Sequence, residues 1–212
     1  RYDGKTWSRF TVSEGLVDDF VIAILEDSRG DMWFGTLRGV SNYSRGIWTT
    51  FTKDDGLADN RVLAIYEDRM GNLWFGTYRS GVSRYNDVTL KSLPVNQLPG
   101  VASILKDTNG NLWFGMANGV TRYNGRTWTT VPFIVSHIAY GMSYVDDQSG
   151  NAVLSIHEDK LGDLYFGDLY GNLHVISPGD FKSVLRQYSV HVFYAFIGGT
   201  ILRPIWAIAE EN

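Results

Sequence analysis

The sequence of 212 residues contains no cysteine. Disulfide bonds, thiol catalysis and cysteine-ligated zinc are therefore excluded, while the redox state of the compartment stays open, because a chain without thiols tolerates either environment. An excess of basic residues is missing too, since 19 Lys and Arg stand against 23 Asp and Glu, for a net charge of −4. Nucleic-acid-binding surfaces carry a basic stripe, so this balance argues against DNA or RNA as a partner.

Long apolar runs are also absent. The best candidate, residues 190–202, is shorter than the roughly 18 residues that a membrane span requires, and Gly198 and Gly199 interrupt it. We therefore expect no membrane insertion by this segment. Hydrophobic residues still make up 44% of the chain and aromatic residues 14%, which favours a folded protein with a substantial core over disorder.

The dominant feature of the sequence is an internal repeat. The string GNLWFGT at residues 71–77 returns in three related forms, GDMWFGT at 30–36, GNLWFGM at 110–116 and GDLYFGD at 162–168. Residues in register before these strings follow one another at intervals of 41, 39 and 52 residues, namely Glu26, Glu67, Lys106 and Glu158. Two intervals near 40 residues and a longer third one indicate a repeat architecture with an insertion before the last copy.

Each unit predicts four short strands. In the second unit the first three are Val62–Tyr66, Leu73–Thr77 and 81–85, and residues 48–52 show the fourth in the first unit. The strands are rich in β-branched and aromatic residues, and Gly, Asn and Asp fill the turns between them. No segment shows a convincing helical period. Residues 180–193 are ambiguous, and they could form either a short helix or degenerate third and fourth strands.

Four antiparallel strands in about 40 residues are typical of a β-propeller blade. We therefore predict an all-β protein, a β-propeller of four-stranded antiparallel blades with about five blade equivalents, four of them full and one incomplete at the termini. Residues 1–212 are predicted to form a single propeller domain or a partial propeller. The predicted parts are a blade tail at 1–12, blades at about 20–52, 61–92, 100–131 and 152–192, and the start of the next blade at 204–212.

The repeat resembles a known family. The pattern EDxxGNLWFGTxxGVSRYNG, followed by WTTFTxxDGL, is similar to the two-component regulator propeller repeat, and it is carried by Glu67, Asp68, residues 71–77 and 81–86, Trp48, Phe51 and residues 54–57. The resemblance implies seven-bladed propellers, often paired, in periplasmic sensor regions of bacterial hybrid histidine kinases, where oligosaccharides are frequent ligands. It thus implies a periplasmic or extracellular location, although the sequence shows no signal peptide of its own.

The two ends of the chain continue the repeat. Residues 205–212 match the start of a unit, and residues 1–11 match the end of one, so that Asn212 aligns with Arg69 and Arg1 with Arg84. A blade closed from both ends would lack its second strand. Two interpretations stay open, a fragment of a larger propeller and a five-unit ring with an incomplete last blade. A fragment would expose an apolar blade face or edge, on which the chain could self-associate.

The residues that recur in every unit are interpreted as scaffold. Because their neighbours are apolar, the aromatic residues of the second strands are expected to pack between blades rather than to stack on sugars: Trp33, Trp74, Trp113 and Tyr165. The acidic pairs, such as Glu67–Asp68, precede a turn glycine in three units, and a catalytic pair would occur only once. We expect the aspartates to accept backbone N–H bonds and to hold the turns.

The residues that change from unit to unit are the site candidates, because loops carry function more often than strands do. The turns between second and third strands contribute Arg38, Tyr78, Arg79, Asn118 and Tyr170, and the loops between blades contribute Asp59, Asn60 and Arg61. The third interval is longer than the others, and its extra residues lie between Trp128 and Val153. This insertion contributes His137, Tyr140, Tyr144 and Asp146.

These features favour binding over catalysis. The sequence has no GxSxG, HxH or HExxH pattern and no phosphate-binding glycine loop, so neither a catalytic residue, a metal nor another cofactor is predicted. We expect a non-catalytic, sensor-type propeller that binds a saccharide or another small polar ligand at its loops. The alternatives are a carbohydrate-active hydrolase or lyase with carboxylates or His137 in its site, and a protein-interaction scaffold.

Overall fold

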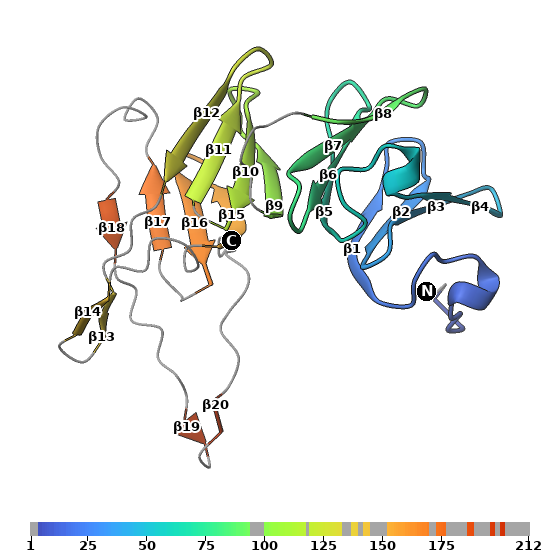
Figure 1. The fold of residues 1–212 in the computed structure, drawn as a ribbon, viewed down its shortest axis with the longest axis horizontal. Helices are drawn as coiled ribbons and strands as arrows, with labels where there is room; N and C mark the ends of the chain where they lie inside the picture. Colours follow the sequence, from blue (N-terminus) through green and yellow to red (C-terminus); the bar gives the residue numbers. More distant parts are fainter. Residues whose placement is uncertain are drawn as a thin grey trace. The chain divides into compact units, whose positions relative to one another are not determined.

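The chain is built almost entirely of β-strands. The computed structural model describes residues 4–93, 100–117, 119–132, 137–139, 142–144, 152–169, 173–176, 186–188, 196–197 and 200–201. The contacts divide the chain into two compact units, Arg1–Val101 and Ala102–Asn212. Within the described part we find four antiparallel sheets of four strands each and two short hairpins, with only two helical turns (Figure 1).

The first unit holds two sheets whose strands follow one another in chain order. The first blade consists of β1 (Val21–Glu26), β2 (Met32–Thr36), β3 (Val40–Ser44) and β4 (Ile47–Phe51). The second blade consists of β5 (Val62–Glu67), β6 (Leu73–Thr77), β7 (Val82–Tyr85) and β8 (Leu90–Ser92). The four strands whose bounds were predicted, at 62–66, 73–77, 81–85 and 48–52, correspond to β5, β6, β7 and β4, and each begins and ends within one residue of the predicted bounds.

The second unit repeats this order. The third blade consists of β9 (Val101–Lys106), β10 (Leu112–Met116), β11 (Gly119–Tyr123) and β12 (Trp128–Pro132), and the fourth of β15 (Val153–Glu158), β16 (Leu164–Asp168), β17 (Leu173–Ile176) and β18 (Arg186–Tyr188). The short hairpins are β13 (His137–Ala139) with β14 (Met142–Tyr144), and β19 (Phe196–Ile197) with β20 (Thr200–Ile201). Residues 186–188 of the ambiguous segment form a strand that pairs with β17.

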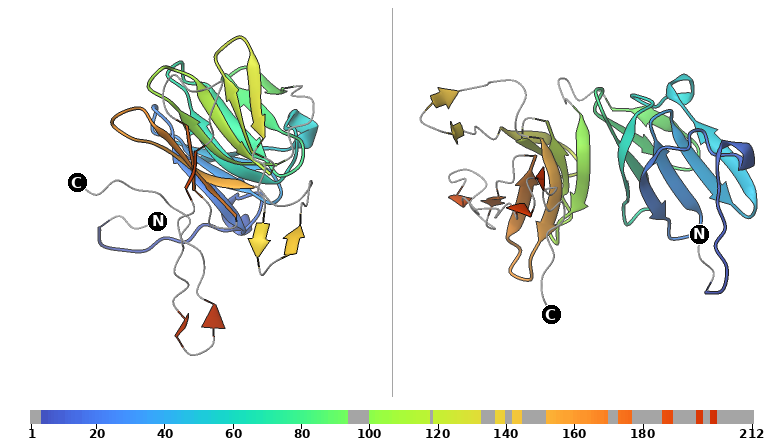
Figure 2. Two further views of the ribbon diagram at one scale, coloured as in Figure 1. Left: turned by 90° about the vertical axis from the view of Figure 1, so that its left-hand side faces the viewer. Right: turned by 90° about the horizontal axis from the view of Figure 1, so that it is seen from below.

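The core of each unit lies between its two blades. In the first unit β1 and β2 lie against β5 (Figure 2). The ring centroid of Trp33 in β2 is 5.9 Å from that of Phe75 in β6. In the second unit the rings of Trp113 and Phe166 are 5.6 Å apart in the same relation. Trp33, Trp74 and Trp113 are at most 3% exposed, which confirms the packing interpretation for these three residues. Tyr165, the fourth member of the series, is only half-buried.

The glycine after each Trp–Phe pair lets neighbouring blades approach closely. A Cβ added to Gly35 would lie 3.0 Å from Cγ1 of Val62 and 3.2 Å from its carbonyl oxygen, and one added to Gly115 would lie 2.7 Å from the carbonyl oxygen of Val153. A side chain there would push the blades apart, which explains the repeated glycine.

The sequence prediction missed two short helices, which lie before β1 and before β5. These 3₁₀ turns are η1 (Val12–Glu14) and η2 (Lys53–Asp55), and each begins with a capping box, in which Thr11 pairs with Glu14 and Thr52 with Asp55. The Thr-x-x-Glu and Thr-x-x-Asp spacing was the available signal. The two turns give the loops that enter the first and second blades the same fold, which positions the residues after them.

Candidate ligand-binding rim

Two of the variable loops meet in the second blade. The backbone N–H of Tyr78, in the turn between β6 and β7, donates to the carbonyl oxygen of Arg61 at 2.9 Å, and Arg61 ends the loop that enters β5. We call the surface formed by residues 56–61 and 78–81 the rim. The structure thus brings together candidates that lie in separate loops of the sequence.

The rim carries one aromatic ring with two cations close to it. The guanidinium carbons of Arg61 and Arg79 each lie 5.2 Å from the centroid of the Tyr78 ring, and Tyr78 is 41% exposed. Neither arginine forms an ion pair with a carboxylate in the described part of the chain. The ring can pack on an apolar ligand face, while the guanidinium groups offer N–H donors to hydroxyl, carboxylate or sulfate oxygens.

Two predicted rim residues instead shape the loop. The side-chain oxygen of Asn60 accepts a hydrogen bond from the N–H of Lys53 at 2.6 Å, and a carboxylate oxygen of Asp59 accepts one from the N–H of Arg61 at 3.0 Å. Asp19 accepts from the N–H of Val12 in the same way in the first blade. These carboxamide and carboxylate groups therefore help to hold Arg61 in place.

The same positions are apolar in the other blades. Phe20 and Leu37 of the first blade align with Arg61 and Tyr78 and are 63% and 37% exposed. In the fourth blade the N–H of Leu169 donates to the carbonyl oxygen of Ala152 at 2.8 Å, as Tyr78 does to Arg61. Phe20, Leu37 and Leu169 were not among the sequence candidates, although their alignment with Arg61 and Tyr78 was a usable signal.

The remaining candidates are spread over other elements. Arg38 is exposed in the turn between β2 and β3, where its N–H donates to the Thr36 hydroxyl at 3.0 Å. His137 and Tyr144 are opposite each other in the β13–β14 hairpin. Outside the described residues lie Asn118, Tyr140, Asp146 and Tyr170.

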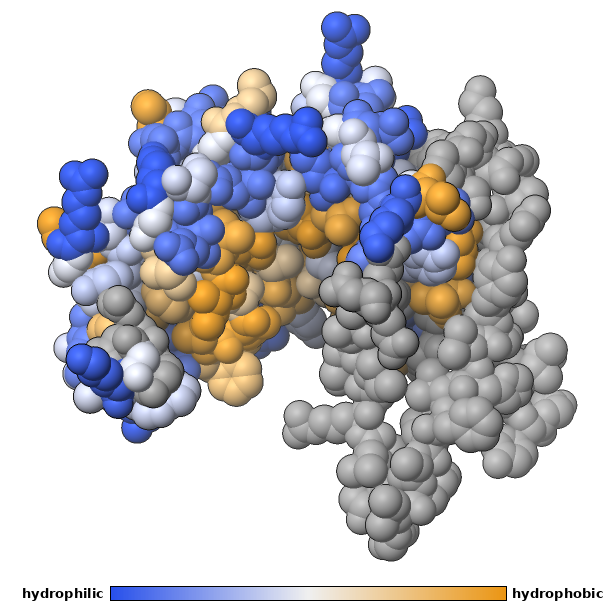
Figure 3. Space-filling model, turned by 180° about the vertical axis from the view of Figure 1, so that it is seen from behind, coloured by the Kyte–Doolittle hydropathy of each residue, from blue (hydrophilic) through white to orange (hydrophobic). Residues whose placement is uncertain are grey.

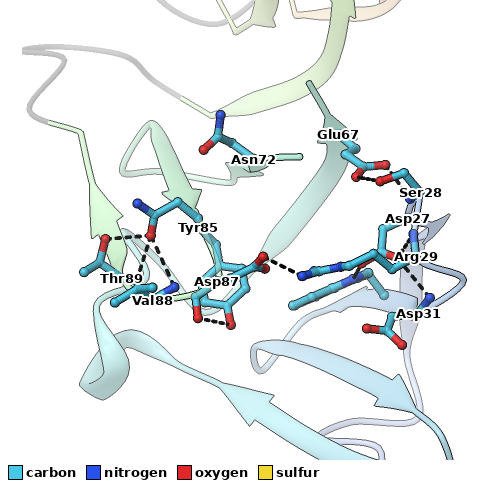
Figure 4. Close-up of polar contacts among 12 residues, drawn as sticks. Asp27, Ser28, Arg29, Asp31, Glu67, Asn72, Tyr85, Asp87, Val88 and Thr89 are labelled. Carbon is cyan, nitrogen blue, oxygen red and sulfur yellow. Dashed lines mark hydrogen bonds and ion pairs between the residues drawn. The ribbon is translucent and has the colours of Figure 1, made fainter. Parts of the chain in front are cut away.

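The opposite end of the sheets, where β1 turns into β2, holds a polar network that joins the first two blades (Figure 4). The carboxylate of Glu67 accepts hydrogen bonds from the N–H and the hydroxyl of Ser28 at 2.7 and 2.6 Å. Arg29 donates to Asp27 of its own turn at 3.3 Å and to Asp87 of the second blade at 2.5 Å. In the second unit Glu158 binds the N–H and hydroxyl of Thr108, each at 2.8 Å.

The aspartate of each acidic pair holds its own turn. In Asp68, Oδ1 accepts from the N–H groups of Met70 and Asn72 at 2.9 and 3.0 Å, and Oδ2 accepts from the Trp74 indole at 3.0 Å. Burial by itself would raise the pKa of Asp68, but these hydrogen bonds outweigh it, and the pKa is lowered. The structural interpretation of the repeated aspartates is confirmed, and Glu67 and Glu158 have the further role of joining blades.

One buried polar pair departs from the repeat. In the fourth blade a ring nitrogen of His174 lies 3.1 Å from a carboxylate oxygen of Asp168, and the two residues are 3% and 6% exposed. Their burial keeps them from a ligand in solvent. Among the residues with described side chains, no group of three His, Asp or Glu is arranged to hold a metal ion.

Comparison with known proteins agrees with this architecture. The model of the two-component regulator propeller matches residues 15–38 and 56–79, and each match runs from the loop before a blade to the turn after its second strand. No protein with a curated description matches the chain significantly. Among the described residues, none of the helical segments is long and apolar enough to cross a bilayer.

Three solved bacterial structures of similar fold show the extent of the likeness. The extracellular domain of BT3049, a candidate hybrid two-component system of B. thetaiotaomicron, shares 22% identity and a TM-score of 0.63 over 82% of this chain. That of BT4673 shares 22% identity and a TM-score of 0.62 over 80%. PorZ, a surface component of the type-IX secretion system of Porphyromonas gingivalis, shares 21% and 0.60 over 82%.

The chain spans about a quarter of the length of these structures, covering 24%, 22% and 29% of them. At such identities the likeness shows the fold alone. Together with the matched repeats, it confirms the resemblance inferred from the sequence. Residues 15–38 and 56–79 match the two-component regulator propeller repeat, and the chain has the all-β fold of a β-propeller built from four-stranded blades.

Proposed function

We propose that this chain is a ligand-recognition part of a sensor-type propeller, located outside the cytoplasm, and that it contacts a saccharide or another small polar ligand at the rim. The observation that carries the proposal is the exposed Tyr78 ring with the guanidinium carbons of Arg61 and Arg79 close to it, each 5.2 Å from the ring centroid. Aromatic rings pack on sugar faces, and arginines donate to sugar hydroxyl and carboxylate oxygens.

The contrast between blades supports the rim as the contact surface. The scaffold residues recur in each blade, whereas only the second blade, among the four described, has an arginine and a tyrosine at these two loop positions. A residue needed for folding would recur with the fold. The similarity in fold to the extracellular domains of two candidate two-component systems supports the sensor role.

A direct test is to titrate the chain with oligosaccharides and to measure binding by calorimetry. Two groups of oligosaccharides are used, neutral ones and ones that contain uronic acids. We expect Tyr78→Ala and Arg79→Ala each to weaken the binding of a saccharide hit at least about tenfold, equivalent to about 1.4 kcal/mol. Arg126→Ala is the matched control, because Arg126 is an exposed arginine in the turn between β11 and β12. Absence of binding to every oligosaccharide, or equal losses in all three variants, would contradict the proposal.

A further inference from the structure

The rim of the second blade adjoins the matching loops of the first blade. A Cβ added to Gly35, near the end of β2, would lie 3.0 Å from Cγ1 of Val62 at the start of β5. In each blade the start of the first strand pairs with the end of the second, through Val21 with Thr36 and Val62 with Thr77. The loop residues next to these pairs therefore leave the two sheets at the same end and in neighbouring positions.

The first blade presents apolar side chains at this end. Phe20 directly precedes β1 and Leu37 directly follows β2, and the two are 63% and 37% exposed. Their counterparts 41 residues later, Arg61 and Tyr78, are exposed as well, although the first blade packs against the second. Exposure at these two positions therefore belongs to the loop end of a blade and persists where a neighbouring blade is present.

Exposure alone does not distinguish Phe20 and Leu37. Apolar side chains reach the surface of the described molecule in several places (Figure 3), and single exposed apolar residues are common in soluble proteins. The distinguishing feature is their position beside cationic groups. Arg38 follows Leu37 and is exposed, and Arg79 occupies the same turn position in the second blade. The apolar pair thus adjoins a row of arginines.

The carboxylates of these loops bind the backbone. Asp18 accepts a hydrogen bond from the N–H of Phe20 at 3.3 Å, as Asp59 does from the N–H of Arg61 at 3.0 Å. In the described part of the chain, Arg38, Arg61 and Arg79 form no ion pair with a carboxylate. An anionic group of a ligand would complement these guanidinium groups through charge-assisted hydrogen bonds.

A ligand with an anionic part and an apolar part can use both blades at once. Packed sheets lie roughly 10 Å apart, so the apolar pair and the arginines of the second blade are close enough for one substituted sugar to contact both. Binding sites commonly combine apolar contact area, which adds affinity, with a few charged groups that fix the orientation of the ligand.

We propose that the ligand of the rim is an acidic saccharide that carries an apolar substituent. Its carboxylate or sulfate binds Arg61 and Arg79, and its apolar substituent packs on Phe20 and Leu37. This inference rests on the proposed function, narrows the class of ligand and extends the contact surface to the first blade. Neutral sugars lack the anionic contact, and unsubstituted acidic sugars lack the apolar one, so both should bind less tightly.

Four small glycosides separate the two contacts, namely methyl and phenyl β-D-glucuronide and methyl and phenyl β-D-glucoside. Their binding to the chain is measured by titration calorimetry. We expect phenyl glucuronide to bind at least about fivefold more tightly than methyl glucuronide, because its ring buries apolar area on the first blade. It should also bind at least about fivefold more tightly than phenyl glucoside, which lacks the carboxylate.

Variants assign each preference to its residues. The double variant Phe20→Ser with Leu37→Ser should reduce the preference for phenyl over methyl glucuronide to less than about twofold and leave the affinity for methyl glucuronide unchanged. Arg79→Ala should instead reduce the preference for glucuronide over glucoside. Val88→Ser is the control and should change neither preference, because Val88 is 86% exposed in the turn between β7 and β8, at the other end of the sheet.

Equal affinity for phenyl and methyl glucuronide, a phenyl preference that survives in the double variant, or absence of binding by all four glycosides would overturn the proposal. The oligosaccharide titration distinguishes this failure from failure of the proposed function. Oligosaccharide binding that Tyr78→Ala weakens, found without any preference for the phenyl glycoside, would retain the rim as a saccharide site and reject the apolar contact on the first blade.

Discussion

Ser28 and Glu67 link two neighbouring blades through a single carboxylate, which accepts hydrogen bonds at 2.7 Å from the serine N–H and at 2.6 Å from its hydroxyl (Figure 4). The serine lies in the turn between β1 and β2, and the glutamate ends β5. Thr108 and Glu158 repeat the contact in the second unit. Because blades cannot bury their faces alone, such contacts fix how one blade sits on the next.

We expect Ser28→Ala and Glu67→Ala to be coupled. Each should lower the free energy of unfolding by about 1–2 kcal/mol, with the larger loss in Glu67→Ala, because Ser28→Ala keeps the backbone N–H bond. The double variant should cost little more than Glu67→Ala alone, because the hydroxyl has no carboxylate to bind once Glu67 is replaced. Urea unfolding of the four proteins measures the coupling. Glu26→Ala is the control and should change stability by less than about 0.5 kcal/mol. Additive losses would show that Glu67 acts independently of Ser28.

Acid should weaken the turns through their aspartates. Because hydrogen bonds lower the pKa of Asp68 below its ordinary value of 3.8, its contribution to stability is present above that value and is lost as pH falls through the lowered pKa. The urea concentration at the midpoint of unfolding should therefore decrease when the pH is lowered below about 4. In Asp68→Asn stability should be lower at pH 7 and should depend less on pH, since an amide does not titrate.

Asp54→Asn is the matched control for this pH series. Asp54 is exposed in η2 and lies outside the turns between strands. Its replacement should therefore leave the loss of stability at acid pH as large as in the unmodified chain. If Asp68→Asn and the unmodified chain lose stability in parallel between pH 5 and pH 3, the carboxylate of Asp68 is not a source of the acid sensitivity.

Close approach of the blades makes Gly35 intolerant of a side chain. We expect Gly35→Ala to cost about 1–3 kcal/mol in unfolding free energy, because the new methyl group would meet Val62 Cγ1 at 3.0 Å and the Val62 carbonyl oxygen at 3.2 Å. In a Val62→Ala background the same substitution should cost less, since one of the two contacts is removed. An equal cost in both backgrounds would place the strain elsewhere.

The fold could be predicted from the sequence because its signals are local and repeated. Strands such as Leu73–Thr77 are written in one short string, and the in-register copies fix the four-stranded unit. Contacts between blades could not be read from a single unit. The pairing of Ser28 with Glu67 could be inferred only by comparing the repeats. At the corresponding pair of positions Arg69 replaces the hydroxyl residue and Lys106 replaces the glutamate, so the two residues change together.

The rim was predicted in part, for a physical reason. Loop position and variation identified Arg61, Tyr78 and Arg79, which the structure brings together. The same criteria selected Asn60, whose side chain holds the N–H of Lys53. Polar residues in loops serve either a ligand or the backbone, and only the geometry of their hydrogen bonds distinguishes the two.

The buried pair of the fourth blade should behave as a unit. His174 is opposite Phe166, as Ser41 is opposite Phe34 in the first blade, and Asp168 stands where Thr36 does. His174→Ser should lower the free energy of unfolding by at least about 1–3 kcal/mol, because it removes the imidazole from a buried carboxylate.

Restoring the pattern of the first blade should relieve that loss. The double variant Asp168→Thr with His174→Ser places a hydroxyl pair where the first blade has Thr36 and Ser41, so it should be more stable than His174→Ser alone. Thermal unfolding of the two variants and of Asp168→Thr measures the difference. A double variant that is less stable than both single variants would show that the two residues are not stabilised by each other, and that neighbouring groups set their environment.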